Sequence, residues 1–202
     1  PLTELTRPGM RVSPERVVFG AGSPTMPDSL MCHELSTSET YPLRSSAEPS
    51  VKDGYLSKPQ PIEFDTADGQ TAHAFFYEPH NIDYSAPNDE RPPLLVVSHG
   101  GPTSAASTTL DLRVQYWTSR GFAVLDVDYG GSTGYGKAYR QRINGQWGIV
   151  DVNDCVNGAM HLVAEGCVDR ERLIIRGSSA GGYTPLSALT FSDVFKAGAS
   201  HY

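Results

Sequence analysis

A serine flanked by small residues lies where a strand-like run meets a helix-like run. Residues 177–181 read Gly-Ser-Ser-Ala-Gly and follow the apolar run at 172–176. They match the G-x-S-x-G pattern with Ser179 at its centre, and this pattern places a nucleophile on a sharp strand-to-helix turn that only small neighbours allow. Ser179 is therefore a candidate nucleophile and Ser178 a structural residue. A plain tight turn or a phosphate-binding nest is the alternative.

A second glycine-rich turn could supply hydrogen-bond donors for acyl transfer. Residues 99–102, His-Gly-Gly-Pro, close the apolar run at 94–98. Glycines there let backbone N–H groups face a substrate oxygen without a Cβ in the way. The N–H of Ala180, at the start of the next helix, could point at the same oxygen. We expect Ala180 with Gly100 or Gly101 to form an oxyanion hole, against the alternative of a simple Gly-Gly-Pro turn.

The groups that would activate the serine are harder to find. A serine hydroxyl needs a base, and the base needs a carboxylate to orient it. In the α/β-hydrolase chain order both follow the serine, and only Asp193 and His201 do so in this chain. Both come too early in the strand order, so we expect the acid and base beyond Tyr202 and a 202-residue chain that is inactive alone. His99 is expected to position its loop, because that loop supplies the oxyanion hole and not the base.

From about residue 57 the chain alternates between strand-like and helix-like runs. Strands are expected at 94–98, 122–128, 172–176 and 195–200, helices at about 106–120, at 151–165 and after Ser179, and a hairpin at 61–79 that turns at 67–69. Buried apolar strands that alternate with helices predict a mostly parallel sheet with helices on both faces. The predicted fold class is α/β.

The first 56 residues have a different character. Short β segments at 16–22, 29–37 and 41–46 are separated by turn-forming residues, which is typical of a β-propeller blade or the edge of a β-sandwich. We therefore predict two domains, a β-rich one at 1–56 and an α/β one at 57–202.

Composition and charge exclude several classes of partner. The 16 basic and 23 acidic residues give a net charge of −7, and no basic stripe could follow a nucleic-acid backbone. No apolar run approaches the roughly 20 residues that a membrane helix needs, so no membrane partner is expected. Cys32, Cys155 and Cys167 are too widely spaced for a disulfide framework or a zinc site, which favours a cytoplasmic protein without a metal.

Four motifs in this order carry a family resemblance: SHGGPTSAAS, DVDYGGSTGYGKAYR, GQWGIVDVNDC and IRGSSAGGYTPLSALTFSDVFKAGAS. Over about residues 60–202 they resemble the catalytic domain of the prolyl oligopeptidase family of serine peptidases, nearest to its dipeptidyl aminopeptidase/acylaminoacyl peptidase branch. The resemblance implies a truncated α/β-hydrolase fold that is preceded by the end of a β-propeller. It also implies that Ser179 is the nucleophile, that Ala180 and residues 99–102 form the oxyanion hole, and that Tyr129 and Tyr135 line the substrate entrance. His99 stands where some members have a tyrosine, so this hole is expected to depend more on backbone N–H groups.

The function these observations favour is hydrolysis of peptide bonds in short peptides through an acyl-enzyme on Ser179. The implied partner is a peptide substrate, and no metal or organic cofactor is implied. An oligomer formed through the rest of a longer chain is left open. A carboxylesterase or lipase shares the serine turn and a related glycine loop. A non-catalytic fragment or pseudoenzyme is the alternative from another class.

Overall fold

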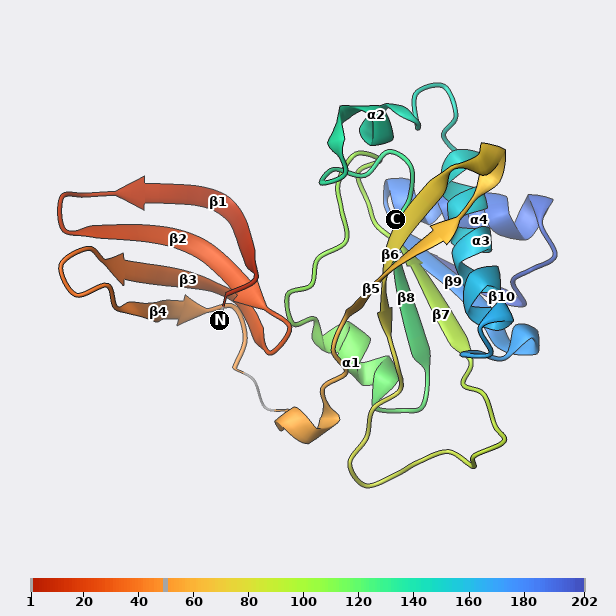
Figure 1. Ribbon diagram of the computed structural model, residues 1–202, viewed down its shortest axis with the longest axis horizontal. Coiled ribbons are helices and arrows are strands. Elements are labelled where there is room, and N and C mark those ends of the chain that lie inside the picture. Colours follow the sequence, from red (N-terminus) through yellow and green to blue (C-terminus); the bar gives the residue numbers. More distant parts are fainter. Residues whose placement is uncertain (1, 49–50, 202) are drawn as a thin grey trace.

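Two β-sheets make up the framework of the molecule. The computed structural model describes residues 2–48 and 51–201. The N-terminal sheet has four strands in the order β1-β2-β3-β4, and the second sheet has six strands in the order β10-β9-β7-β8-β6-β5. Figure 1 shows the two sheets beside each other, with the helices gathered around the six-stranded one.

The four-stranded sheet is an antiparallel meander. Its strands are β1 (Glu4–Val12), β2 (Arg16–Ser23), β3 (Met26–Glu34) and β4 (Thr40–Ser45). The segments expected at 16–22, 29–37 and 41–46 correspond to β2, β3 and β4, although β3 begins and ends three residues earlier than expected. Strand β1 was not predicted. Its pairing with β2 shifts register between Thr6 and Met10, and Gly9 within it has a φ of 99°, so the strand contains a bulge that hides the alternating pattern.

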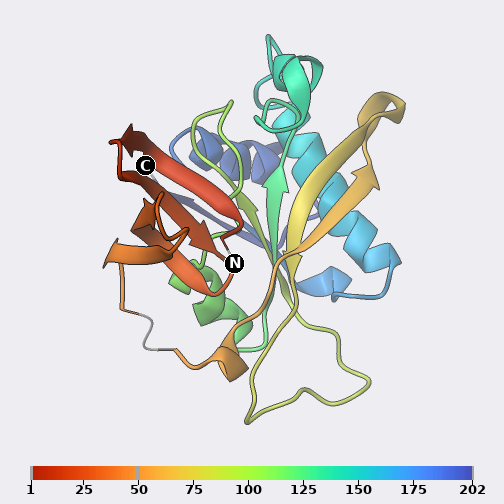
Figure 2. The same ribbon diagram turned by 60° about the vertical axis from the view of Figure 1, so that its left-hand side comes forward.

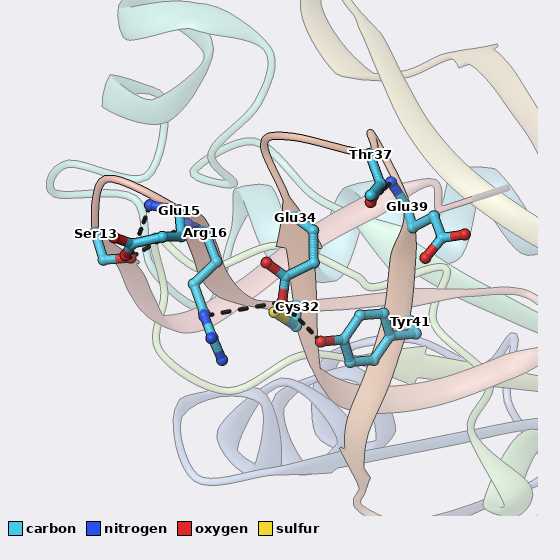
Figure 3. Close-up of polar contacts among 8 residues, drawn as sticks. All are labelled: Ser13, Glu15, Arg16, Cys32, Glu34, Thr37, Glu39 and Tyr41. Atoms are coloured by element: carbon cyan, nitrogen blue, oxygen red, sulfur yellow. Dashed lines mark hydrogen bonds and ion pairs between the residues drawn. The ribbon is translucent and has the colours of Figure 1, made fainter.

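Side-chain contacts hold one end of this sheet together, as Figure 3 shows. The Glu34 carboxylate accepts a hydrogen bond from the Tyr41 hydroxyl at 2.8 Å, and Arg16 Nε lies 3.8 Å away. The Tyr41 hydrogen bond is the main reason why the pKa of Glu34 lies below its ordinary value. Strands β2, β3 and β4 are thereby joined at a place where few apolar side chains are buried.

The six-stranded sheet is mixed and mostly parallel. Strands β7 (Leu94–Ser98), β8 (Ala123–Asp128), β9 (Leu173–Ser178) and β10 (Ala197–His201) are parallel, and β6 (Thr71–Tyr77) and β5 (Gln60–Asp65) form an antiparallel edge. The hairpin predicted at 61–79 is β5 and β6. Asp68 and Gly69 turn it with φ values of 59° and 66°, as an Asp-Gly pair allows.

The helices cover the two faces of this sheet unequally. Helices α3 (Val150–Ala164) and α4 (Ala180–Phe191) pack on one face, α1 (Leu112–Thr118) packs on the other, and α2 (Gly136–Gln141) precedes α3. Along β7, Leu94 and Val96 join the core under α3 and α4, whereas Leu95 and Val97 face α1. This alternation explains why β7 is apolar throughout its length.

Helix α1 is shorter than the predicted 106–120, and this is a correction. It begins after Asp111, whose side chain caps the helix by accepting from the N–H of Arg113. Residues 106–110 form a loop because their polar groups bond to other parts of the chain, as described below. Helix α2 was not predicted because six residues carry little periodic signal.

Two further findings concern the whole chain. Strand β4 ends at Ser45 and β5 begins at Gln60, so the domain boundary predicted at residues 56/57 lies between the two sheets and stays a prediction. Within the described ranges, none of the helices has the length and apolarity required to span a bilayer.

Candidate active site

Ser179 occupies a sharp turn between β9 and α4. Its φ is 55° and its ψ is −124°, which is a strained conformation for a residue with a side chain. Its N–H donates to the carbonyl oxygen of His201 at 2.9 Å, and its own carbonyl oxygen accepts from the N–H of Gly182 at 2.8 Å. These bonds fix the turn from both sides and leave the serine itself exposed. The hydroxyl is thus free to meet a substrate.

The glycines around Ser179 are required by the close approach of three elements. A Cβ on Gly177 would lie 1.9 Å from the carbonyl oxygen of Gly181. A Cβ on Gly181 would lie 2.2 Å from the carbonyl oxygen of Ser98 and 2.4 Å from that of His99. Strands β7 and β9 and the start of α4 are therefore packed backbone against backbone, and only hydrogen fits between them.

Pro185 explains an unusual contact within this packing. A proline in the second turn of α4 has no N–H to give to the carbonyl group four residues earlier, which belongs to Gly181. The Ser98 hydroxyl donates to that oxygen at 2.8 Å instead. A side chain at the end of β7 thus takes the place of the missing helix hydrogen bond and holds α4 against the sheet.

We expect Ser98→Ala to lower the free energy of unfolding by about 1–3 kcal/mol, because the buried Gly181 carbonyl group loses its donor. Pro185→Ala restores an N–H at the correct place in the helix. The double variant is therefore expected to recover part of the loss. Urea unfolding of the wild type, the two single variants and the double variant should give a coupling free energy of about 0.5–2 kcal/mol. Strict additivity of the two single effects would contradict this explanation.

The loop after β7 brings glycine backbone to the serine. A Cβ on Gly100 would lie 3.0 Å from the carbonyl oxygen of Ser178 and 3.4 Å from the Cβ of Ser179, so the Gly100 backbone lies directly against the turn. Gly101 has a φ of 63°, which favours glycine. Within the described part of the chain, the N–H groups of Gly100, Gly101 and Ala180 have no acceptor. Three N–H groups without a backbone acceptor thus lie in the segments that meet at Ser179, and their predicted role as an oxyanion hole stays a prediction.

His99 and Tyr129 together hold the loop at residues 99–102 in place. The Tyr129 hydroxyl donates to the His99 carbonyl oxygen at 3.0 Å, and the two rings stack with centroids 4.3 Å apart. The Ser132 hydroxyl donates to the Tyr129 carbonyl oxygen and lies 2.7 Å from His99 Nε2, and His99 Nδ1 lies 3.1 Å from the Gly100 carbonyl oxygen. Burial lowers the pKa of His99 and keeps the ring neutral. His99 is a positioning residue in this arrangement.

The structure corrects the expectation for Tyr129. Its exposed fraction is 0% and its hydroxyl is bonded to the loop, so it cannot touch a substrate. The family resemblance implied a place at the substrate entrance for this tyrosine, which belongs to the glycine-rich segment after β8. Its side chain instead packs against residues of the loop after β7, where its ring stacks on His99.

Tyr135, by contrast, is partly exposed, with 37% of its surface accessible. Its ring stacks on His73 with centroids 4.1 Å apart, and its hydroxyl donates to Asp128 Oδ2 at 2.9 Å. A role for Tyr135 in substrate binding stays a prediction.

Asp128, at the end of β8, is a buried carboxyl that sequence reasoning missed. Its Oδ1 accepts from the N–H of Ala106 at 2.7 Å, and its Oδ2 accepts from Tyr135. Burial outweighs these hydrogen bonds and raises the pKa of Asp128 to about 6. The one available signal was an acidic residue at the carboxyl end of a buried parallel strand, where ligand sites gather in such sheets.

This pKa predicts a pH-dependent stability. Between about pH 4 and pH 6 the folded protein keeps a proton on Asp128 that the unfolded chain releases, so the stability contribution of this group falls as the pH rises through that window. We expect the wild-type free energy of unfolding, minus that of Asp128→Asn, to decrease by up to about 3 kcal/mol from pH 4 to pH 7. Urea unfolding at both pH values measures it. Tyr135→Phe removes a hydrogen-bond donor to the Asp128 carboxylate, so it should extend the pH range in which Asp128 stays protonated to higher pH. If the difference in the free energy of unfolding between the wild type and Asp128→Asn increased with pH, the raised pKa of Asp128 would be contradicted.

Among residues 2–48 and 51–201, no histidine ring is hydrogen-bonded to Ser179. The rings of four histidines have partners away from Ser179: His33 with Thr40, His73 with Tyr135, His99 with Ser132, and His161 beside Phe64. His80 is bonded through its backbone N–H to Thr118 at the end of α1, and His201 lies in the exposed β10 beside Ser178 of β9. His201 reaches Ser179 only through its backbone carbonyl oxygen. The roles of Ser179 as a nucleophile and of the neighbouring amides as an oxyanion hole stay predictions.

A cavity on the α1 face of the sheet is lined in part by His99 and Gly100 and also by a carboxyl group with an unpartnered oxygen. It is lined by residues that include Leu95, Val97, Asp126 and Arg176. Asp126 Oδ1 has no hydrogen-bond partner in the described part of the chain, and burial raises the pKa of Asp126 to about 8. No group of three or more potential metal-ligating side chains occurs among the described residues.

Comparison with known proteins fits this geometry. The family model named prolyl oligopeptidase family matches residues 108–202. A puromycin-hydrolyzing peptidase of Mycobacterium tuberculosis has a structure similar to this one, with a TM-score of 0.95 and 43% sequence identity over 98% of this chain. This chain belongs to the prolyl oligopeptidase family. Both the family resemblance and the predicted fold class are thereby confirmed.

Other relatives of this prolyl oligopeptidase family chain come from the branch predicted from the sequence. Dipeptidyl aminopeptidase BIII of Pseudoxanthomonas mexicana is 33% identical over 76% of this chain. The acylaminoacyl peptidase of Pyrococcus horikoshii is 28% identical over 95% of this chain, with a TM-score of 0.78. The chain spans less than a third of the length of these relatives, namely 23% of the first and 30% of the second and of the mycobacterial peptidase.

Proposed function

We propose that Ser179 is the nucleophile of a serine peptidase that hydrolyses peptide bonds of short peptides. The observation that carries this proposal is the strained, exposed Ser179 with the Gly100 backbone against its Cβ. Such strain persists at sites where surrounding structure enforces it, and a nucleophile on a tight turn is one reason to enforce it.

In the proposed reaction, Ser179 Oγ attacks the carbonyl carbon of the substrate amide. Its proton passes to a histidine base, which the described residues do not supply, and the negative oxygen accepts hydrogen bonds from Ala180 and from Gly100 or Gly101. The C–N bond then breaks, the amine leaves with the proton, and water hydrolyses the acyl-enzyme. No step of this scheme needs a metal or an organic cofactor.

The relatives support the substrate class. Three similar structures are named for puromycin hydrolysis and another for acylaminoacyl peptidase, and a relative by sequence is named dipeptidyl aminopeptidase. Puromycin carries its amino acid through an amide bond, so all three names describe cleavage near the end of a small amide. We extend that class to this protein, whose location in the cytoplasm also stays a prediction.

The test compares amide and ester substrates with the full-length protein that carries this sequence. Aminoacyl and acyl-dipeptidyl p-nitroanilides and puromycin represent the amides, and p-nitrophenyl butyrate represents the esters. We expect turnover of the amides together with labelling of Ser179 by a fluorophosphonate, located by mass spectrometry of the peptides. Ester turnover without amide turnover would favour the carboxylesterase alternative, and a complete lack of labelling would favour a non-catalytic protein.

We further propose that residues 1–202 alone show no turnover, because a serine without a base is a weak nucleophile. Assay of the purified 202-residue chain beside the full-length protein measures this. Amide hydrolysis by the shorter chain would require a base within residues 1–202 and would contradict the proposal.

A further inference from the structure

The loop that follows the oxyanion glycines is bonded to the N-terminal sheet. Glu4, near the start of β1, accepts from the N–H of Thr108 at 3.0 Å and from the hydroxyl of Ser107 at 2.9 Å through one carboxylate oxygen, Oε2. The hydroxyl of Thr109 lies 3.4 Å from the same oxygen. Figures 1 and 2 both show the four-stranded sheet beside this loop. One side chain of the first sheet thus binds three consecutive residues of the second domain.

The backbone of the N-terminal sheet adds to this contact. The carbonyl oxygen of Ser23, at the end of β2, accepts from the N–H of Leu110 at 2.8 Å. Gly22 lies so close to the loop that a Cβ there would be 2.4 Å from the side chain of Thr109. The loop and the sheet are therefore in close contact at Gly22 and Thr109.

A second carboxylate holds the same loop from the opposite side. Asp128, in the six-stranded sheet, accepts from the N–H of Ala106. Residues 106–109 are thus bound by one acidic side chain from each sheet. Charge-assisted bonds of this kind are shorter and stronger than neutral ones, so they define the path of the loop.

A short series of backbone bonds connects this segment to the oxyanion glycines. The N–H of Ser104 donates to the carbonyl oxygen of Gly101 at 2.7 Å, and the carbonyl oxygen of Ser104 accepts from the N–H of Thr133 at 2.8 Å. Only Ala105 separates Ser104 from Ala106. A displacement of residues 106–109 would therefore reach Gly101 through few covalent and hydrogen bonds.

We propose that Glu4 is a positioning residue through which the N-terminal sheet sets the geometry of the oxyanion loop. The inference rests on the proposed function, since it assigns a role in that reaction to a residue of the other sheet. Glu4 touches no reacting atom. It acts by fixing the segment that leads into the loop, where a small displacement of a donor can cost a large factor in rate.

The kinetic test uses Glu4→Ala, Glu4→Gln and the control Glu39→Ala in the full-length protein. Glu39 is exposed on the same sheet, at the turn before β4. We expect Glu4→Ala to lower kcat for a p-nitroanilide about 10- to 100-fold while KM changes by less than about threefold, because the loss concerns the transition state. Glu4→Gln keeps an acceptor oxygen and is expected to retain most of the rate, and Glu39→Ala is expected to match the wild type.

A structural test is independent of catalysis. Hydrogen exchange of the full-length protein, read at single amides, should show faster exchange of Thr108 in Glu4→Ala, because its acceptor is gone. The proposal further requires faster exchange at Ala106 and Ser104, which Glu4 does not touch. A purely local contact would release Thr108 alone.

These readouts separate the two proposals. If the wild type lacks amide turnover but exchange spreads from Thr108 to Ser104, the proposed function is wrong while the coupling of the sheet to the loop stands. A kcat of Glu4→Ala within about twofold of the wild type would overturn the positioning role. So would exchange that changes at Thr108 only, or an equal loss of kcat in Glu39→Ala.

Discussion

Ser179→Ala in the full-length protein is expected to lower kcat for peptide amides by about 10⁴- to 10⁶-fold, the range seen when a serine peptidase loses its nucleophile. The variant keeps the Cβ and the backbone conformation with its φ of 55°, so the turn should still form. Labelling by a fluorophosphonate should disappear, whereas the far-ultraviolet circular dichroism spectrum and the melting temperature should remain close to those of the wild type. Initial rates and mass spectrometry of the labelled protein measure both effects.

The neighbouring serine provides a matched control for this experiment. Ser178 is also exposed, but it is the last residue of β9 and its backbone pairs with His201 in β10. We expect Ser178→Ala to stay within about threefold of the wild-type rate. If Ser178→Ala were inactive and Ser179→Ala active, the nucleophile would be misassigned.

Gly181→Ala is the second change with a large expected effect. The new Cβ would lie within 2.4 Å of two backbone oxygens, those of Ser98 and His99, and backbone cannot move aside as a side chain can. Helix α4 would have to shift away from β7, which moves the Ala180 N–H away from Gly100. We expect a loss of more than about 3 kcal/mol in the free energy of unfolding, together with a labelling rate lowered more than about 100-fold.

Gly158→Ala is the control for that substitution. Gly158 lies inside α3, and its added Cβ would meet side chains, Phe64 at 2.9 Å and Leu125 at 3.0 Å. These atoms belong to side chains that can shift, and alanine favours the helix by about 1 kcal/mol, so the net loss should stay below about 1.5 kcal/mol. Urea unfolding of both variants makes the comparison. Equal losses would show that the glycines at the Ser179 turn have no special steric role.

The features that could be predicted from the sequence depend on residues close together along the chain. The turn around Ser179 needs small residues at fixed spacing, and each parallel strand is a short apolar run, so both leave a local pattern. The hairpin turn at Asp68 and Gly69 is local in the same sense. For the parallel strands and α3, predicted and observed bounds differ by at most two residues, and those of β7 are identical.

Apart from the bulged β1 and the short α2, the features that were missed depend on residues far apart in the sequence. Glu4 and Thr108 are separated by about a hundred residues, and no local sequence pattern predicts their contact. The same contact explains why residues 106–110 are a loop, since their polar groups bond to Glu4, Asp128 and Ser23 instead of to a helix. Tyr129 was misplaced for a related reason, because its ring packs on His99 from a loop after another strand.

The most direct test of the central claim is a crystal structure of the full-length protein after reaction with a fluorophosphonate. We predict a covalent bond from Ser179 Oγ to phosphorus. We also predict a phosphoryl oxygen about 2.7–3.1 Å from the Ala180 nitrogen and from the nitrogen of Gly100 or Gly101. A bond to another residue, or a phosphoryl oxygen turned away from both the Ala180 and the Gly100–Gly101 amides, would contradict it.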